Sequence, residues 1–164
     1  MKNIAKIGSN GEFEPRRQTI DSAGYDIYAT EDISVTEEFK VVDTGVIFDG
    51  TEVMITTLHQ IVNPKSGKLL TRVNIVKNWY AQVHPRSSMA INKGLQLANI
   101  GIIDQDYRDT IKVAVRSDKP FLIKKGDRFA QMIFMPYLIN VKEIRPSKQR
   151  EGGIGSTDKK LEEF

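Results

Sequence analysis

Two groups of residues, at 86–88 and 104–107, have side chains suited to hydrolysis at a phosphorus atom. Arg86, Ser87 and Ser88 combine a planar guanidinium with two hydroxyls beside a turn, a common way to hold phosphate oxygens. Asp104 follows two isoleucines, and a partly desolvated carboxylate accepts a proton more readily, so it is a candidate base for an attacking water. The pair of groups therefore predicts attack of water on a phosphorus atom of a phosphorylated substrate, with positive charge offsetting the negative charge that accumulates on the phosphate oxygens.

Each group also has a simpler interpretation when taken alone. Pro-Arg-Ser-Ser at 85–88 is often a solvated loop, and Asp104 and Asp106 are typical of an ordinary turn. The elements and motifs around the two groups must decide between these interpretations.

Short β-branched runs between turn signals predict an all-β antiparallel sandwich or barrel. One short helix is expected after the Arg86 turn, through 90–93, ending at Gly94 as a C-terminal cap. The predicted strands are Ile33–Val35, Lys40–Val42, Val46–Phe48, Val53–Leu58, Val73–Val76, Ala81–Val83, Ile111–Val115 and Met132–Met135.

Length and composition are those of one domain that needs neither disulfides nor a structural metal. The chain has 164 residues, no cysteine and a net charge of +3, which is too small for a protein that coats nucleic acid. No apolar run is long enough to span a bilayer and no signal-peptide core follows Met1, so a soluble cytoplasmic protein is expected, in the host cytoplasm if the source is viral or phage.

Five segments at characteristic intervals resemble the motifs of the trimeric dUTP pyrophosphatase (dUTPase) family. The resemblance spans nearly the whole chain except an insertion at about 51–77, and it implies a distorted β-barrel or jelly-roll sandwich. It also implies a homotrimer with shared active sites that converts dUTP and water to dUMP and pyrophosphate. The segments are Ala23–Ala29, Thr44–Val46, Pro85–Tyr107, Gly126–Gln131 and Gly152–Thr157.

The resemblance assigns a role to each site residue. Asp104 activates the water that attacks the α-phosphorus, and Asp26 holds Mg²⁺ through water, which suits an ion that keeps much of its hydration shell. Ser156 and Thr157 close on the γ-phosphate from a mobile Gly-rich arm at 151–164, outside the β-rich domain at 1–150. The substrate-binding residues implied are Arg86, Ser87, Ser88, Asn99, Ile102, Ile103, Tyr107, Lys112, Gln131, Arg150, Ile154, Gly155, Ser156 and Thr157.

Substrate choice is expected to reside in a hairpin between Leu97 and Ile103, followed by Tyr107. Backbone groups and the Asn99 amide would pair with uracil, whereas cytosine would leave buried polar groups unpaired. By the resemblance, Tyr107 lies under the deoxyribose and excludes a 2′-hydroxyl; the alternative is an aromatic residue that fills the core.

Two other functions are compatible with the fold. A dCTP deaminase of the same fold shares the Arg-Ser-Ser element, but it needs a glutamate where this chain has Arg108, which stays protonated and cannot shuttle a proton. A nucleotide-binding regulatory protein that acts on a partner through the insertion is the second alternative.

The chain departs from the family pattern at several positions. Asp109 replaces a glycine, and Asn99 is one residue closer to Asp104 than expected, so Ala98 or Ile100 is an alternative contact for uracil. Ile154 stands where an aromatic ring usually stacks on uracil, which removes about 0.5–1.5 kcal/mol of stacking. Arg150 is also one position closer to the glycines than is usual.

The insertion is predicted to form an extended β-hairpin. Two β-prone runs, 52–62 and 69–77, flank a turn at 63–68. From Glu52 to Asn78 there are four basic residues and one acidic residue. Their net charge of +3 equals that of the whole chain. The hairpin either packs on its own or a neighbouring subunit, or binds a nucleic acid or acidic protein.

Overall fold

Antiparallel strands make up nearly all the regular structure in the described part of this chain. The computed structural model describes residues 6–9, 12–49, 53–55, 60–62, 65–67, 69–71, 74–98, 101–144 and 150. The strands are β1 (Lys6–Ser9), β2 (Tyr25–Tyr28), β3 (Ile33–Val35), β4 (Lys40–Asp43), β5 (Val46–Asp49), β6 (Val53–Ile55), β7 (Gln60–Val62), β8 (Leu69–Thr71), β9 (Asn74–Val76), β10 (Trp79–Pro85), β11 (Gln96–Leu97), β12 (Ile102–Asp104), β13 (Lys112–Arg116), β14 (Phe121–Ile123) and β15 (Arg128–Pro136). This confirms the predicted all-β class.

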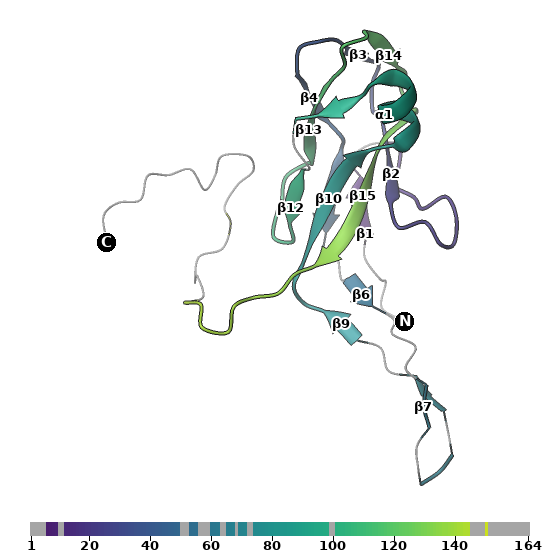
Figure 1. The fold of residues 1–164 in the computed structure, drawn as a ribbon, viewed down its shortest axis with the longest axis vertical. Coiled ribbons are helices and arrows are strands. Elements are labelled where there is room, and N and C mark those ends of the chain that lie inside the picture. Colours follow the sequence, from purple (N-terminus) through teal and green to yellow (C-terminus); the bar gives the residue numbers. More distant parts are fainter. Residues whose placement is uncertain are drawn as a thin grey trace.

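The largest sheet has the strand order β12-β10-β15-β2, and a second sheet has the order β11-β13-β4. Smaller ladders join β14 to β3 and β1 to β5. Figure 1 shows β10 and β15 running side by side along the body, with α1 at the end where β3 and β14 lie. The long β10–β15 pair therefore links the two ends of the molecule.

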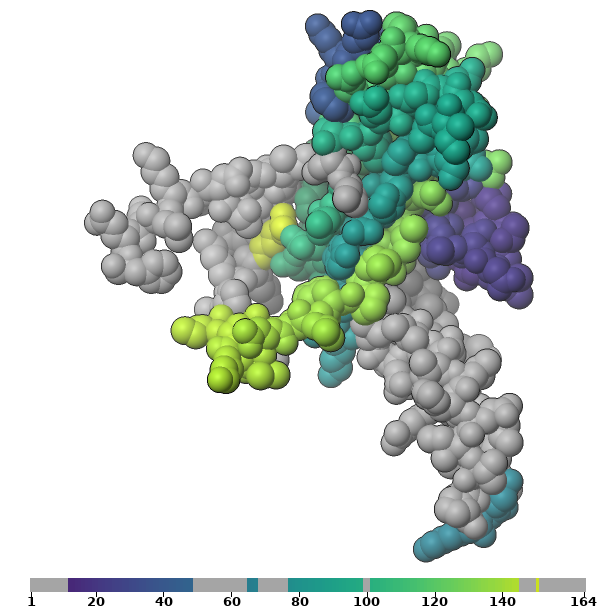
Figure 2. All heavy atoms as spheres, in the orientation of Figure 1, coloured from purple at the N-terminus to yellow at the C-terminus, as the bar shows by residue number. Residues whose placement is uncertain are grey.

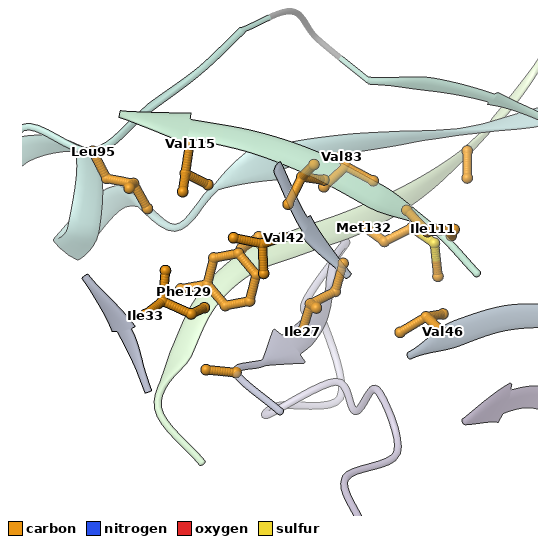
Figure 3. Close-up of a cluster of buried hydrophobic side chains, with 14 of the residues drawn as sticks. Ile27, Ile33, Val42, Val46, Val83, Leu95, Ile111, Val115, Phe129 and Met132 are labelled. Atoms are coloured by element: carbon orange, nitrogen blue, oxygen red, sulfur yellow. The ribbon is translucent and has the colours of Figure 1, made fainter. Parts of the chain in front are cut away.

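The core fills the space between these sheets because the strands alternate inward apolar and outward polar residues. Along β10, Trp79, Ala81 and Val83 are buried, while the residues between them are half-buried. Figure 3 shows the Phe129 ring near Ile33 and Val42 in the buried cluster. Phe129 is fully buried, so the β15 strand is fixed firmly to the core.

The one helix in the described part of the chain, α1 (Ser87–Lys93), follows β10 directly. It ends as predicted at Gly94, whose φ of 68° is left-handed and suits a residue without a Cβ. Within the described ranges, no helix is long and apolar enough to cross a lipid bilayer.

The insertion forms the expected extended hairpin. Antiparallel ladders join β6 to β9 and β7 to β8, and the turn between β7 and β8 includes Gly67 at a φ of 63°. Ile55 pairs with Asn74 and Gln60 pairs with Thr71, so the first strand has two more residues between the ladders than the second. In Figure 1, β7 lies farther from the main sheets than β6 and β9 do.

Candidate functional site

The end of β10 gathers the residues predicted to hold phosphates around one buried carboxylate. Arg86 Nε lies 3.1 Å from Asp26 Oδ1, and Arg128 Nη1 lies 3.0 Å from Asp26 Oδ2. Asp26 is only 6% exposed, and a buried carboxylate needs such partners. One carboxylate thus orients two guanidiniums, and the three side chains together have a formal charge of +1, which favours an anionic ligand.

Gln131 lies beside this ion-paired group, because it pairs with Asp26 on β2 and with His84 on β10. The backbone of Gly24 approaches it so closely that an added Cβ would be 2.6 Å from the Gln131 amide oxygen and 3.2 Å from its Cβ. Ser87 and Ser88 begin α1 immediately after Arg86 and are exposed. The absence of a side chain at Gly24 is therefore what lets Gln131 occupy this position.

Arg128 is the residue of this group that the sequence reasoning missed. It belongs to the Gly126–Gln131 segment, in which only Gln131 was assigned a role. A basic residue three positions before that glutamine was the available signal, but its ion pair with Asp26 spans 102 positions in sequence. We refer below to Asp26, Arg86, Ser87, Ser88, Arg128 and Gln131 as the phosphate-grip group.

The residues around Asp26 fit magnesium only if the ion is held through one of its bound waters. Asp26 Oδ1 is ion-paired with Arg86 and Oδ2 accepts an N–H from Arg128, and no cluster of three or more acidic, histidine or cysteine residues occurs in the described part of the chain. Each oxygen has a further lone pair, so Asp26 can accept a hydrogen bond from a metal-bound water. The inner ligands would then have to come from substrate phosphates.

Asp104 lies elsewhere, at the end of the edge strand β12. Its side chain is 54% exposed and forms an ion pair with Arg150 Nη2, while Arg150 Nε lies 3.4 Å from Asp106 Oδ1. The Arg150 guanidinium also stacks over the Tyr107 ring, 5.7 Å from its centroid. Asp104, Asp106, Tyr107 and Arg150 thus form a second cluster, which we call the base group.

Strand β12 ends at Asp104, and across the turn at 105–106 both carboxylates contact Arg150. One expectation about this cluster was wrong. The preceding isoleucines do not desolvate Asp104 within one chain, since Ile102 is 63% exposed. Ile103 is half-buried and packs against the core instead.

Tyr107 is buried and belongs to the core, while its ring also contacts Arg150. Burial raises the pKa of its phenol, which donates a hydrogen bond to the Thr110 carbonyl. Lys112 Nζ lies 3.2 Å from Asp109 Oδ2. The Thr110 amide, and then Lys112, lower the pKa of Asp109, and Asp109 in turn raises the pKa of Lys112.

A hairpin was predicted between Leu97 and Ile103, but in the described residues its two strands do not pair with each other. β11 pairs with β13, whereas β12 pairs with β10 in the other sheet. Ala98 donates to Ala114 and Gly101 accepts from Val83, so the chain crosses between sheets here. Asn99, Ile154, Gly155, Ser156 and Thr157 lie outside the described residues.

The phosphate-grip group and the base group are well separated within one chain. Asp104 pairs with Tyr80 near the start of β10, whereas Arg86 follows the end of the same strand. Six residues of extended strand correspond to about 20 Å. The α-phosphate of one nucleotide cannot contact both groups across that distance.

Comparisons with known proteins identify the family. The dUTPase family model matches residues 63–158. A Hydrogenobaculum deoxyuridine 5′-triphosphate nucleotidohydrolase is 35% identical over 147 residues, covering 85% of this chain and 94% of the relative. The enzyme of the same name from Desulfitobacterium hafniense is 35% identical over 150 residues, covering 87% of this chain and 85% of the relative.

Solved structures agree at the level of the fold. A mutant dUTPase from phage phi11 of S. aureus, described with a structural Mg(II) ion, aligns with a TM-score of 0.59 at 17% identity, covering 87% of this chain and 96% of that one. The EIAV dUTPase aligns with a TM-score of 0.58 at 19% identity, with the same two shares covered. The family-model match and the relatives at 35% identity show that the chain belongs to the dUTPase family.

Proposed function

We propose that this chain hydrolyses dUTP to dUMP and pyrophosphate. The observation that supports this most strongly is the 35% identity, over nearly the full length of both chains, to a deoxyuridine 5′-triphosphate nucleotidohydrolase. The residues that such a reaction needs, a carboxylate and a cluster of cations, are present as Asp104 and the pair Arg86 and Arg128. The chain is therefore a dUTP diphosphatase.

A deaminase is not favoured. Arg108 occupies the position where deamination would need a carboxylate, and its guanidinium donates to the carbonyls of Gln105 and Tyr107. A guanidinium stays protonated and cannot pass a proton between water and a leaving amine. The relatives described above are also named as nucleotidohydrolases rather than deaminases.

The proposed mechanism divides the work between the two clusters. Asp104 takes the proton of a water that attacks the α-phosphorus in line with the departing pyrophosphate. Arg86, Ser87, Ser88 and Gln131 hold the phosphate chain, and Arg128 adds a second positive charge beside it. Lys112 and Arg150 are proposed to contact substrate after leaving their present partners, Asp109 and Asp104.

Each active site is proposed to combine the phosphate-grip group of one subunit with the base group of another. The separation of about 20 Å along β10 supports this, because within the described residues of one chain the two groups lie too far apart to form one site. Contacts to uracil and the phosphates stay predicted for Asn99 and for the arm residues Ile154, Gly155, Ser156 and Thr157.

A homotrimer is the proposed assembly. Leu138, Val141 and Ile144 are each more than 95% exposed in the single chain, and Figure 2 shows the light-green segment at 137–144 projecting from the body. Closely spaced apolar side chains in water indicate a surface that another chain covers. A cytoplasmic location and a mobile arm at 151–164 stay predictions from the sequence.

Magnesium is proposed to act with the substrate. It would supply positive charge to the phosphate oxygens, and Asp26 would hold one of its waters while still orienting Arg86 and Arg128. A binding partner for the basic hairpin at 51–77 stays a hypothesis beside the simpler one, that the hairpin packs on its own or a neighbouring subunit.

The substrate assignment is tested by measuring pyrophosphate release from dUTP, dCTP, dTTP and UTP with magnesium. We expect release from dUTP and at least about 10²-fold slower release from each of the others. Cytosine would leave buried polar groups unpaired, the methyl group of thymine would be excluded sterically, and Tyr107 is proposed to exclude the 2′-hydroxyl of UTP. Equal rates with all four would contradict the proposal. Binding of dUTP without any release would favour the nucleotide-binding regulatory alternative.

Gly24→Ala is expected to raise the KM for dUTP about fivefold, because the added Cβ displaces the Gln131 amide from the phosphates. Steady-state kinetics on Gly24→Ala, Gln131→Ala and the double variant would measure this. In a Gln131→Ala background the same substitution should leave KM unchanged. An equal rise in that background would mean that Gly24 acts on something other than Gln131.

A further inference from the structure

A network of hydrogen bonds surrounds Thr110, three residues after Tyr107. The Thr110 amide donates to Asp109 Oδ1 at 2.8 Å, and its hydroxyl donates to Asp43 Oδ2 at 2.6 Å. Its carbonyl accepts the Tyr107 phenol at 3.2 Å. All three polar groups of Thr110 are therefore engaged, and one of them fixes the tip of the Tyr107 ring.

The same turn is attached to the corner between β4 and β5. Asp43 Oδ1 accepts the Gly45 amide at 2.8 Å, so both oxygens of this carboxylate have partners. Ile111 donates to the Val46 carbonyl at 2.8 Å and accepts the Thr44 hydroxyl at 2.7 Å. Residues distant in sequence thus hold the turn from two sides.

Not every contact here contributes equally. The ion pair between Lys112 and Asp109 joins side chains that are 35% and 49% exposed, and such pairs stabilise little. The phenol bond is partly buried, and Tyr107 itself is only 6% exposed. Because a packed core has little free volume, a shift of the Thr110 carbonyl would move the buried Tyr107 ring with it.

We propose that Thr110 and Asp43 are positioning residues for sugar selection, which hold the Tyr107 ring where it leaves no room for a 2′-hydroxyl. This rests on the proposed hydrolysis of dUTP and on the proposed place of Tyr107 under the deoxyribose. Discrimination by steric exclusion depends on a fixed wall, and a ring that shifts by a fraction of an ångström admits the larger sugar. Sugar selectivity is then set partly by two residues that touch no substrate.

Thr110→Val removes the hydroxyl at constant volume, and Thr110→Ser retains it. For the valine variant we expect the ratio of kcat/KM for dUTP to kcat/KM for UTP to fall about tenfold, with kcat for dUTP within about twofold of the native value. The serine variant should keep the native ratio. Asp118→Asn is the matched control and should leave the ratio unchanged, because it removes only the ion pair of Asp118 with Arg116, the last residue of β13.

A double-substitution cycle separates positioning from a general loss of structure. If Thr110 acts through the phenol, Thr110→Val should have no further effect on the ratio in a Tyr107→Phe background. The inference is overturned if the ratio is unchanged in Thr110→Val, if both substrates lose activity equally, or if the two effects add. These outcomes differ from failure of the proposed function, in which the native chain itself does not release pyrophosphate from dUTP.

Discussion

Replacing Asp104 with asparagine is expected to slow pyrophosphate release from dUTP by about 10²–10⁴-fold, the usual contribution of a general base. The amide has the same shape but does not accept the proton of the attacking water. Because Asp104 is exposed at the end of an edge strand, the substitution should leave the fold intact. Release assays give the rate, and titration calorimetry should show that dUTP still binds with similar affinity.

Asp106→Asn is the matched control, since Asp106 contacts the same Arg150 side chain as Asp104 does. We expect its rate to stay within about threefold of the native rate, because an exposed ion pair contributes little. If Asp106→Asn shows the larger loss, the base has been misassigned. If both variants keep the native rate, neither carboxylate is the base.

Chains with Arg86→Gln and chains with Asp104→Asn are expected to be nearly inactive alone and active when assembled together. Each proposed site takes its phosphate-grip group from one subunit and its base group from another, so a mixed assembly regenerates some intact sites. With equal amounts and random mixing, about one quarter of the sites receive both intact halves. Glutamine at 86 keeps an N–H that can donate to the buried Asp26 carboxylate.

The measurement is pyrophosphate release after the two variants are unfolded together and refolded, compared with each variant treated alone. A mixture of Arg86→Gln with Gln131→Ala should show no more than the mean activity of the two variants treated alone, because both changes affect the same phosphate-grip group. Recovery in that mixture as well would indicate a cause other than shared sites. No recovery in either mixture would contradict the shared site, provided that the refolded chains assemble.

Much of the fold was predictable because buried strands alternate and the turns have clear signals. The run at 33–35 matches β3 in full, and Gly94 ends α1 as expected. β2 was not predicted as a strand because Tyr25–Tyr28 has a polar residue in its centre, and Asp26 is tolerated there only through its two arginine partners. A sequence does not show a partner 102 positions away.

The site was predictable in its residue types and less so in its geometry. Arg86 and Asp104 were identified from their chemistry and from the family motifs, whereas their separation depends on the register that pairs Asp104 with Tyr80. The turn that places Asp106 beside Asp104, and the crossing of the chain between sheets after Leu97, also depend on pairing with distant strands. Local patterns do not specify such register.

The distance along β10 also affects how activity depends on the amount of protein in a cell. If each site is shared as proposed, a newly made chain has only two half-sites, so the reaction begins only when copies meet. At low abundance the total rate should then rise faster than in proportion to the number of chains, because assembly and catalysis both depend on that number. A modest change in synthesis would therefore produce a larger change in dUTP clearance, without any dedicated regulatory ligand.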